Sequence, residues 1–110
     1  MGPFLREAKQ AMTDAPEQIV IAALHEEMQR IRTRLPSSRW YLFGSITTAK
    51  RPVEDIDLLV VCDADRDCES VRAELASICL RFPIHLLLMT PCEEEEVKFI
   101  QSEKAREVAT

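Results

Sequence analysis

The stretch that decides the fold reads WYLFGS over residues 40–45 and, after nine intervening residues, DIDLLVV over residues 55–61. Each half contains a short apolar run, which predicts a β-strand. Side chains two positions apart in a strand lie on the same face. We therefore expect Asp55 and Asp57 to project side by side, with the apolar residues between and after them on the opposite face.

Two neighbouring carboxylates repel each other, so a folded protein rarely aligns them without a positive partner. Hard oxygen ligands favour Mg²⁺ or Mn²⁺, which proteins hold through one or two carboxylates together with substrate phosphates. Asp55 and Asp57 are therefore predicted metal ligands.

The Gly44-Ser45 pair follows the first predicted strand. Gly44 has no Cβ, so another group can approach its backbone closely. Ser45 is predicted to open a short helix or turn whose free N–H groups would suit a phosphate. A phosphate site beside a divalent metal indicates a nucleoside triphosphate, with ATP as the first candidate. The simpler alternative is a tight turn followed by an acidic strand end in solvent.

With these residues, the pattern resembles the signature of the DNA polymerase β-like nucleotidyltransferase superfamily, and within it the minimal nucleotidyltransferases of prokaryotes. The motif covers residues 39–62, and the order of predicted elements extends the likeness over most of the chain. The resemblance implies a small mixed sheet packed with helices. It also implies that Gly44 and Ser45 hold the triphosphate and that Asp55 and Asp57 bind two metal ions.

The resemblance further implies a third carboxylate on a later strand, within residues 83–89, but the chain has His85 at that place. Imidazole is a poor ligand for Mg²⁺, although it ligates transition metals and acts as a base near neutral pH. Three interpretations of His85 stay open: a hydrogen-bonded structural residue, a catalytic base or Mn²⁺/Zn²⁺ ligand, or a sign of lost activity.

A second departure concerns the loop after the Gly-Ser pair. Many superfamily members have Arg-Gly there, whereas this chain has Lys50 and Arg51 a few residues later and no second glycine. These cations would reach a β- or γ-phosphate from the loop. The alternative is an exposed basic pair without a ligand.

The composition predicts one globular α/β (α+β) domain over residues 1–110, with residues 1–15 as a short helix or a flexible N-terminal segment. Apolar residues make up 46% and charged residues 30% of the chain, as in soluble globular proteins. The net charge of −5 argues against an extended nucleic-acid surface. No apolar run is long enough to span a bilayer, and residues 1–10 do not resemble a secretory signal.

Four cysteines, at positions 62, 68, 79 and 92, lack the C-x-x-C spacing of structural zinc sites. Cys62 and Cys79 fall in apolar patterns and are predicted core residues. Reduced thiols fit a cytoplasmic protein. The acidic residues around position 65 resemble a metal cluster, but we interpret them as helix-capping and first-turn charges.

The predicted sheet has about three strands, at residues 39–43, 55–62 and 83–89, flanked by helices. One helix begins near Asp14-Ala15-Pro16 and ends before Pro36, with apolar residues at spacings of three and four. His25 lies beside that apolar stripe and is given no chemical role. Another helix follows Asp63-Ala64-Asp65, whose carboxylates are expected to cap it.

The last predicted helix begins at Thr90 with a capping box that pairs Thr90 with Glu93, and Pro91 occupies the first helical position. The run of four glutamates from position 93 then suits a helix N-terminus and needs no catalytic role. We expect this helix to pack through Val97, Ile100 and the methylenes of Lys104 before it frays.

These patterns give two functional hypotheses. The first is an enzyme that transfers a nucleoside monophosphate from an NTP to a hydroxyl on a protein or small molecule, with Asp55 and Asp57 at the metals and His85 as the base. The resemblance implies a partner such as a HEPN-type or substrate-binding subunit, or a toxin–antitoxin context. The second hypothesis is an inactive nucleotidyltransferase-like binding module that regulates a partner protein.

Overall fold

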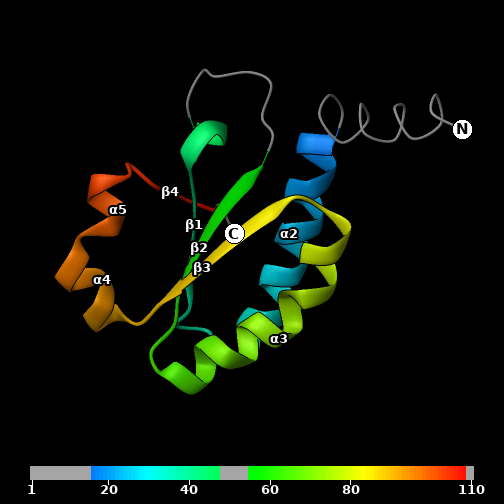
Figure 1. Cartoon of the computed structure of the whole chain (residues 1–110). Coiled ribbons are helices and arrows are strands. Elements are labelled where there is room, and N and C mark those ends of the chain that lie inside the picture. The colour runs from blue at the N-terminus through cyan, green and yellow to red at the C-terminus, as the bar shows by residue number, and fades with distance from the viewer. Residues whose placement is uncertain (1–15, 48–54, 109–110) are drawn as a thin grey trace, which may run out of the picture.

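The computed structural model describes residues 16–47 and 55–108 (Figure 1). The elements in chain order are α2 (Pro16–Arg32), β1 (Arg39–Phe43), the 3₁₀ turn η1 (Gly44–Thr47), β2 (Ile56–Val61), α3 (Asp65–Arg81), β3 (Ile84–Met89), α4 (Pro91–Val97), α5 (Phe99–Ser102) and β4 (Arg106–Glu107). The predictions for residues 1–15, including Asp14 and Ala15 at the expected helix start, lie outside the described residues.

The four strands form one mixed sheet in the order β3-β2-β1-β4. The central strand β2 pairs antiparallel with β1 and parallel with β3. A parallel pair needs a crossover connection, which α3 supplies. The mixed sheet flanked by helices was predicted correctly, but the two-residue strand β4, which pairs with β1, was not.

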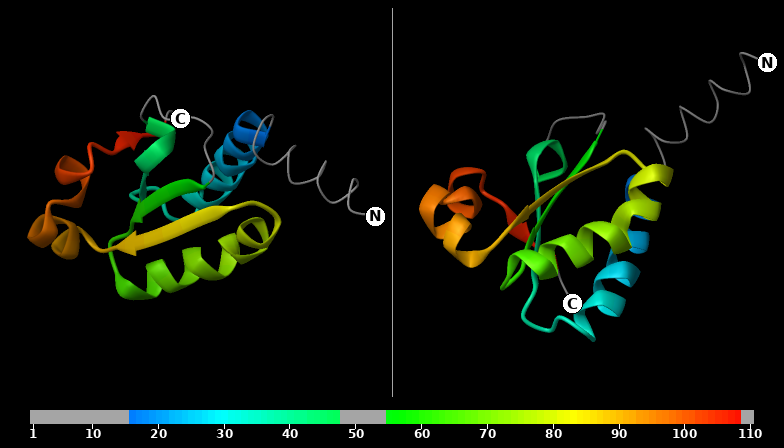
Figure 2. Two further views of the ribbon diagram at one scale, coloured as in Figure 1. Left: turned by 45° about the horizontal axis from the view of Figure 1, so that its top comes forward. Right: turned by 60° about the horizontal axis from the view of Figure 1, so that its bottom comes forward.

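One face of the sheet is covered by α2 and α3, and Figure 2 shows the two long helices side by side. The apolar stripe of α2 and the buried side of α3 pack on alternate residues of β2. This first cluster consists of Val20, Leu24, Met28, Ile31, Trp40, Ile56, Leu58, Val60, Cys62, Val71, Leu75 and Ile78. The described helices contain none that is long and apolar enough to cross a membrane.

The other face carries a smaller cluster, which α5 and the residues after it cover in part. Its buried residues are Tyr41, Phe43, Leu59 and Val61, with Phe99 and Ile100 packed against them. The rings of Phe43 and Phe99 meet edge to face, with centroids 4.9 Å apart. Because both faces are covered, five of the six β2 residues are buried, as the apolar run predicted.

Charged contacts join α2 to α3. Glu74 of α3 pairs with both Arg30 and Arg34. Arg30 lies in the last turn of α2, and Arg34 lies just beyond the end of that helix. Their shared partner shows that they tie the two helices together across the surface.

The start of α3 differs from the prediction. Its N-cap is Ala64, which has no side chain to cap, and neither neighbouring aspartate replaces it. Asp63 instead accepts a hydrogen bond from the hydroxyl of Ser37, in the turn before β1. Asp65 and Asp67 remain as first-turn charges, where they favour the helix dipole.

The capping box at Thr90 and Glu93 forms as predicted, with Pro91 in the first turn of α4. The helix then stops at Lys98, which is left-handed at φ 54°. Glu94 accepts a hydrogen bond from the backbone N–H of Ile100, 2.8 Å away, and so satisfies a donor of the next helix, α5.

The expected packing of this last helical region was only partly correct. Ile100 packs on the second cluster, whereas Val97 is 56% exposed. Lys104 is exposed in a turn with φ 52° and contributes no core packing. The chain does not fray there but continues into β4.

All four cysteines are free thiols. Cys62 is buried at the end of β2, where burial and the neighbouring Cys68 raise its pKa to about 12. Burial also raises the pKa of Cys79, which packs against the first cluster. Both therefore act as small core residues, as the sequence predicted.

A buried hydrogen-bond relay closes the turn between α2 and β1. Ser38 is 2% exposed, and its hydroxyl accepts from the indole N–H of Trp40 at 3.0 Å. The same hydroxyl donates to the carbonyl of Leu35 at 2.8 Å. The relay lets the large Trp40 ring enter the first cluster without leaving its polar N–H unpaired.

Replacing Ser38→Ala should lower the free energy of unfolding by about 1–3 kcal/mol, because the buried indole N–H loses its acceptor. Urea denaturation measures the change. The control is Ser102→Ala, at an exposed serine of α5, which should stay within about 0.5 kcal/mol of the parent chain. Equal effects at the two positions would show that the relay adds no stability.

Candidate active site

Gly44 ends β1 and begins η1 with φ 75°, a left-handed conformation that glycine adopts without strain. A Cβ built at this position would lie 2.1 Å from Oδ2 of Asp57. The glycine is therefore required twice, once by the turn and once by the carboxylate that fills the space beside it.

Asp57 lies near the start of the interior strand β2, between Phe43 of β1 and His85 of β3 in the register. It shares its strand face with Leu59 and Val61, the β2 members of the second cluster. Their apolar cover does not extend to Asp57, whose side chain keeps 22% exposure. The carboxylate thus sits where the covered part of this face ends.

His85 contacts Asp57 directly. Its Nδ1 lies 3.2 Å from Oδ1 of the carboxylate, while its side chain is 73% exposed. Because an ionised carboxylate only accepts hydrogen bonds, the contact requires the proton on Nδ1. The neutral ring then presents an unprotonated Nε2 on an accessible side chain.

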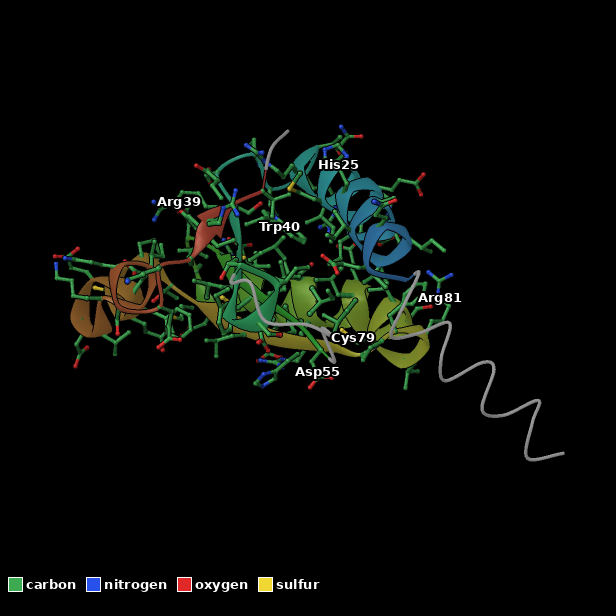
Figure 3. All side chains as sticks on the ribbon, turned by 90° about the horizontal axis from the view of Figure 1, so that it is seen from above. His25, Arg39, Trp40, Asp55, Cys79 and Arg81 are labelled. Carbon is green, nitrogen blue, oxygen red and sulfur yellow. The ribbon has the colours of Figure 1, made fainter. Side chains whose placement is uncertain are left out.

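Asp55 directly precedes β2 and is exposed. Figure 3 shows it across the sheet from His25. Among residues 16–47 and 55–108, no three His, Cys, Asp or Glu side chains come close enough to hold a metal ion together. The structure therefore joins Asp57 to His85 and Gly44, and leaves Asp55 beside them at the start of the strand.

The remaining predicted residues belong to the loop after β1. Ser45 is partly buried within η1, the short helical turn that the sequence predicted there. Its neighbour Thr47 donates a hydrogen bond to the carbonyl of Gly44 at 2.8 Å and so closes the turn. Lys50 and Arg51 lie outside the described residues.

A pocket of about 410 Å³ lies on the other side of η1, between that turn, α2 and the C-terminal segment. Leu42 and Ile46 form part of its apolar wall, and His25 and Arg106 are among its polar residues. The sequence interpretation gave His25 no role. Its place in the pocket depends on the approach of β4 to α2, which no local pattern signals.

Comparison with known proteins gave one informative result. No family model matches the chain, and no curated protein matches it. A crystal structure described as that of a putative nucleotidyltransferase superposes with a TM-score of 0.57 and 20% sequence identity, covering 77% of this chain and 97% of that one.

The chain has the nucleotidyltransferase fold. This confirms the fold expected from the Gly-Ser and Asp-x-Asp pattern, together with its mixed sheet and flanking helices. At this level of identity the similarity concerns the fold alone, because function depends on the residues placed on it. Within the nucleotidyltransferase fold, Gly44, Asp57 and His85 meet where β1, β2 and β3 are paired.

Replacing Gly44→Ala should destabilise the fold by about 2 kcal/mol or more. About 1–2 kcal/mol comes from the left-handed backbone and the rest from the clash with Asp57. In an Asp57→Ala background the clash is absent, so the same change should cost only the backbone part. Urea denaturation of the four proteins gives the coupling energy.

A coupling energy near zero would contradict this account, since it would mean that the methyl group and the carboxylate do not compete for one space. The NMR signals of the His85 ring supply a second measurement. Their chemical shifts should change in Gly44→Ala, because the added methyl group would displace the Asp57 carboxylate that contacts Nδ1.

Proposed function

We propose that the chain is a metal-dependent nucleotidyltransferase that transfers a nucleoside monophosphate from an NTP to a hydroxyl acceptor and releases pyrophosphate. The observation that carries the proposal is the meeting of Gly44, Asp57 and His85 at one corner of a nucleotidyltransferase fold. A turn open to phosphate, a carboxylate and an accessible imidazole supply the group types that this transfer needs.

In this proposal His85 is the general base. Asp57 accepts a hydrogen bond from the Nδ1–H group and so fixes both the tautomer and the direction of the ring. Nε2 then takes the proton of the acceptor hydroxyl as its oxygen attacks the α-phosphate. This assigns to a carboxylate–imidazole pair the proton transfer that the resemblance assigns to a third carboxylate.

The donor set fits a divalent cation of the Mg²⁺ or Mn²⁺ class. Asp57 and the exposed Asp55 would hold it, with the remaining ligands from triphosphate oxygens, since such ions use one or two carboxylates together with phosphates. When bound, the cation would neutralise charge on the triphosphate and the leaving pyrophosphate.

Gly44 and Ser45 would orient the phosphates in this proposal, with Lys50 and Arg51 as further cations from the loop. The absence of a Cβ at Gly44 keeps the turn close to Asp57, so phosphate and carboxylate would face the same space. A HEPN-type or substrate-binding partner would present the acceptor. ATP is the first nucleotide to test.

Two observations favour a second function, that of an inactive binding module which regulates a partner or serves as its antitoxin. The described residues contain no three-ligand metal cluster, and the strand position expected to hold a carboxylate has His85 instead. Such a module would keep Gly44 and Asp57 for the geometry of the sheet, and its surface would carry the function.

Calorimetric titration with ATP and then the other NTPs, in Mg²⁺ or Mn²⁺, tests the proposal before the acceptor is known. We expect metal-dependent binding that weakens at least about tenfold, about 1.4 kcal/mol, in the double variant Asp55→Ala, Asp57→Ala. The loss should follow from removing the charges that hold the cation.

The matched control is Asp63→Ala, Asp65→Ala, which removes two carboxylates beyond the opposite end of β2. It changes the net charge equally, so a general electrostatic effect would weaken binding in both double variants. Absence of NTP binding by the folded parent chain would reject the enzyme proposal for the isolated chain and favour the binding module.

Replacing His85→Asp tests whether position 85 belongs to the metal site. It places a second carboxylate against Asp57, and the repulsion should lower the melting temperature in the absence of divalent cations. Added Mg²⁺ should restore stability, because the cation neutralises the pair. Calorimetric melting with and without Mg²⁺ measures both effects.

The control is His85→Asn, which keeps a polar side chain but adds no charge. Its melting temperature should not respond to Mg²⁺ more than that of the parent. If His85→Asp also gains no response to Mg²⁺, position 85 does not contribute to a metal site.

A further inference from the structure

The pocket of about 410 Å³ between α2, η1 and the C-terminal segment, here named the α2 pocket, lies outside the candidate active site. Its volume falls within the range of about 300–1,000 Å³ that is usual for small-molecule sites. Leu42 lines the pocket and packs against the first cluster, whereas Asp57 shares its sheet face with the second cluster. The two sites therefore lie on opposite faces of the sheet.

One wall of the α2 pocket is apolar. Its side chains come from α2, β1, η1 and the segment after β4, and they are those of Ile21, Leu42, Ile46 and Val108. All four are half-buried, and all except Ile21 pack against the first cluster. The backbone N–H of Val108 donates a hydrogen bond to the carbonyl of Trp40 at 2.8 Å, which holds the end of this segment on β1. The wall is thus an open continuation of the main core.

Arg106 and His25 supply the α2 pocket with hydrogen-bond donors. Arg106 is directly opposite Leu42 in the antiparallel ladder, and opposite residues have their side chains on the same face of a sheet. Its guanidinium therefore lies on the face where Leu42 lines the pocket. His25 follows Ile21 by four residues, so both lie on one side of α2. In the described part of the chain, neither donor side chain has a hydrogen bond or an ion pair.

The two acidic residues of the pocket leave these donors available. Glu107 is directly opposite Tyr41, a member of the second cluster, so its carboxylate stands on the other face of the sheet. Glu17 precedes His25 by eight residues, which is about 12 Å along the helix axis. It is also engaged in an interaction of its own. The donors of His25 and Arg106 are therefore not neutralised by a carboxylate of the pocket.

These features indicate the chemistry of a ligand. A guanidinium is always charged and pairs best with carboxylate or phosphate oxygens, to which it donates two parallel hydrogen bonds. An imidazole adds one N–H donor when it is neutral and two when it is protonated. The apolar wall favours a ligand whose body has hydrocarbon or aromatic surface to bury. A small organic anion satisfies both parts of the pocket.

We infer that the α2 pocket binds a small organic anion. The apolar body of the ligand packs on the wall, and its carboxylate or phosphate oxygens accept hydrogen bonds from Arg106 and His25. The inference does not depend on the proposed nucleotide transfer, because the α2 pocket and the group of Gly44, Asp57 and His85 share only η1 among the described elements. Failure of NTP binding would leave it unchanged.

A titration of the full chain, followed by the backbone amide signals in NMR, tests the inference. The probes are octanoate and octyl phosphate, which join the two candidate head groups to the same apolar body. We expect saturable shifts at the amides of Ile21, Ile46 and Val108, with a dissociation constant below about 1 mM for the tighter probe, which identifies the head group. Absence of saturation with both probes at about 5 mM would overturn the inference.

Octylamine is the matched probe of opposite charge. The net charge of the chain is −5, so a general electrostatic attraction would favour the amine over the two anions. A preference for the anions therefore has to come from the pocket itself. Inorganic phosphate should bind at least about tenfold more weakly than octyl phosphate, because it has no body to pack on the wall. Equal binding of octylamine and the tighter anion would contradict an anion site.

A first pair of variants tests the guanidinium. Arg106→Gln should weaken binding of the tighter probe at least about tenfold, because it removes the charged donors. Arg39→Gln is the control, since Arg39 is an exposed arginine of β1 that does not line the pocket. The amide signal of Val108 in the ligand-free variants checks that the segment after β4 keeps its place.

A second pair places a carboxylate in the wall or directly beside it. Ile21→Asp should weaken binding of the anion at least about tenfold, through repulsion and the loss of apolar surface. Ala22→Asp adds the same charge at the exposed neighbouring position, where solvent screens it, and should change binding by less than about twofold. Circular dichroism checks that α2 stays folded. Equal effects within either pair of folded variants would show that the anion does not bind in this pocket.

Discussion

The contact between Gly44 and Asp57 is the constraint on which the candidate site depends. The carboxylate occupies the space that a Cβ would need, and the left-handed turn directs the chain away from β1 at the same residue. Both features require the register that pairs Phe43 with Asp57. A slip of β2 by one residue against its neighbours would move Asp57 to the other face and separate it from His85.

That register is held by apolar packing on two faces. Ile56, Leu58 and Val60 pack under the long helices, while Leu59 and Val61 pack toward α5. A shifted strand would exchange these sets and bring Asp57 into the main core. Asp57 therefore stays partly exposed because the apolar residues of the second cluster do not extend over it. A more complete cover would bury the carboxylate and raise the cost of its charge.

The sequence predicted the features that local patterns specify. The strand of residues 39–43, the short turn at Ser45 and the Thr90 capping box follow from propensity and capping chemistry, and the structure contains them. It did not predict β4 or the break at Lys98, because a two-residue strand has no periodicity and a left-handed lysine has no sequence signal. The contact of His85 with Asp57 needed the parallel register of β2 and β3, which arises only when the whole sheet assembles.

The strand β3 carries both His85 and the open edge, and these two features use different directions. Backbone groups point within the plane of a sheet, whereas side chains stand perpendicular to it. The outer backbone groups of the edge strand β3 therefore point away from the face on which His85 meets Asp57. The helix α3 packs on the opposite face, with the first cluster, and so lies across the sheet from the carboxylate. The same short strand thus presents His85 on one face of the sheet and unpaired backbone groups along its edge, and a change in either would leave the other in place.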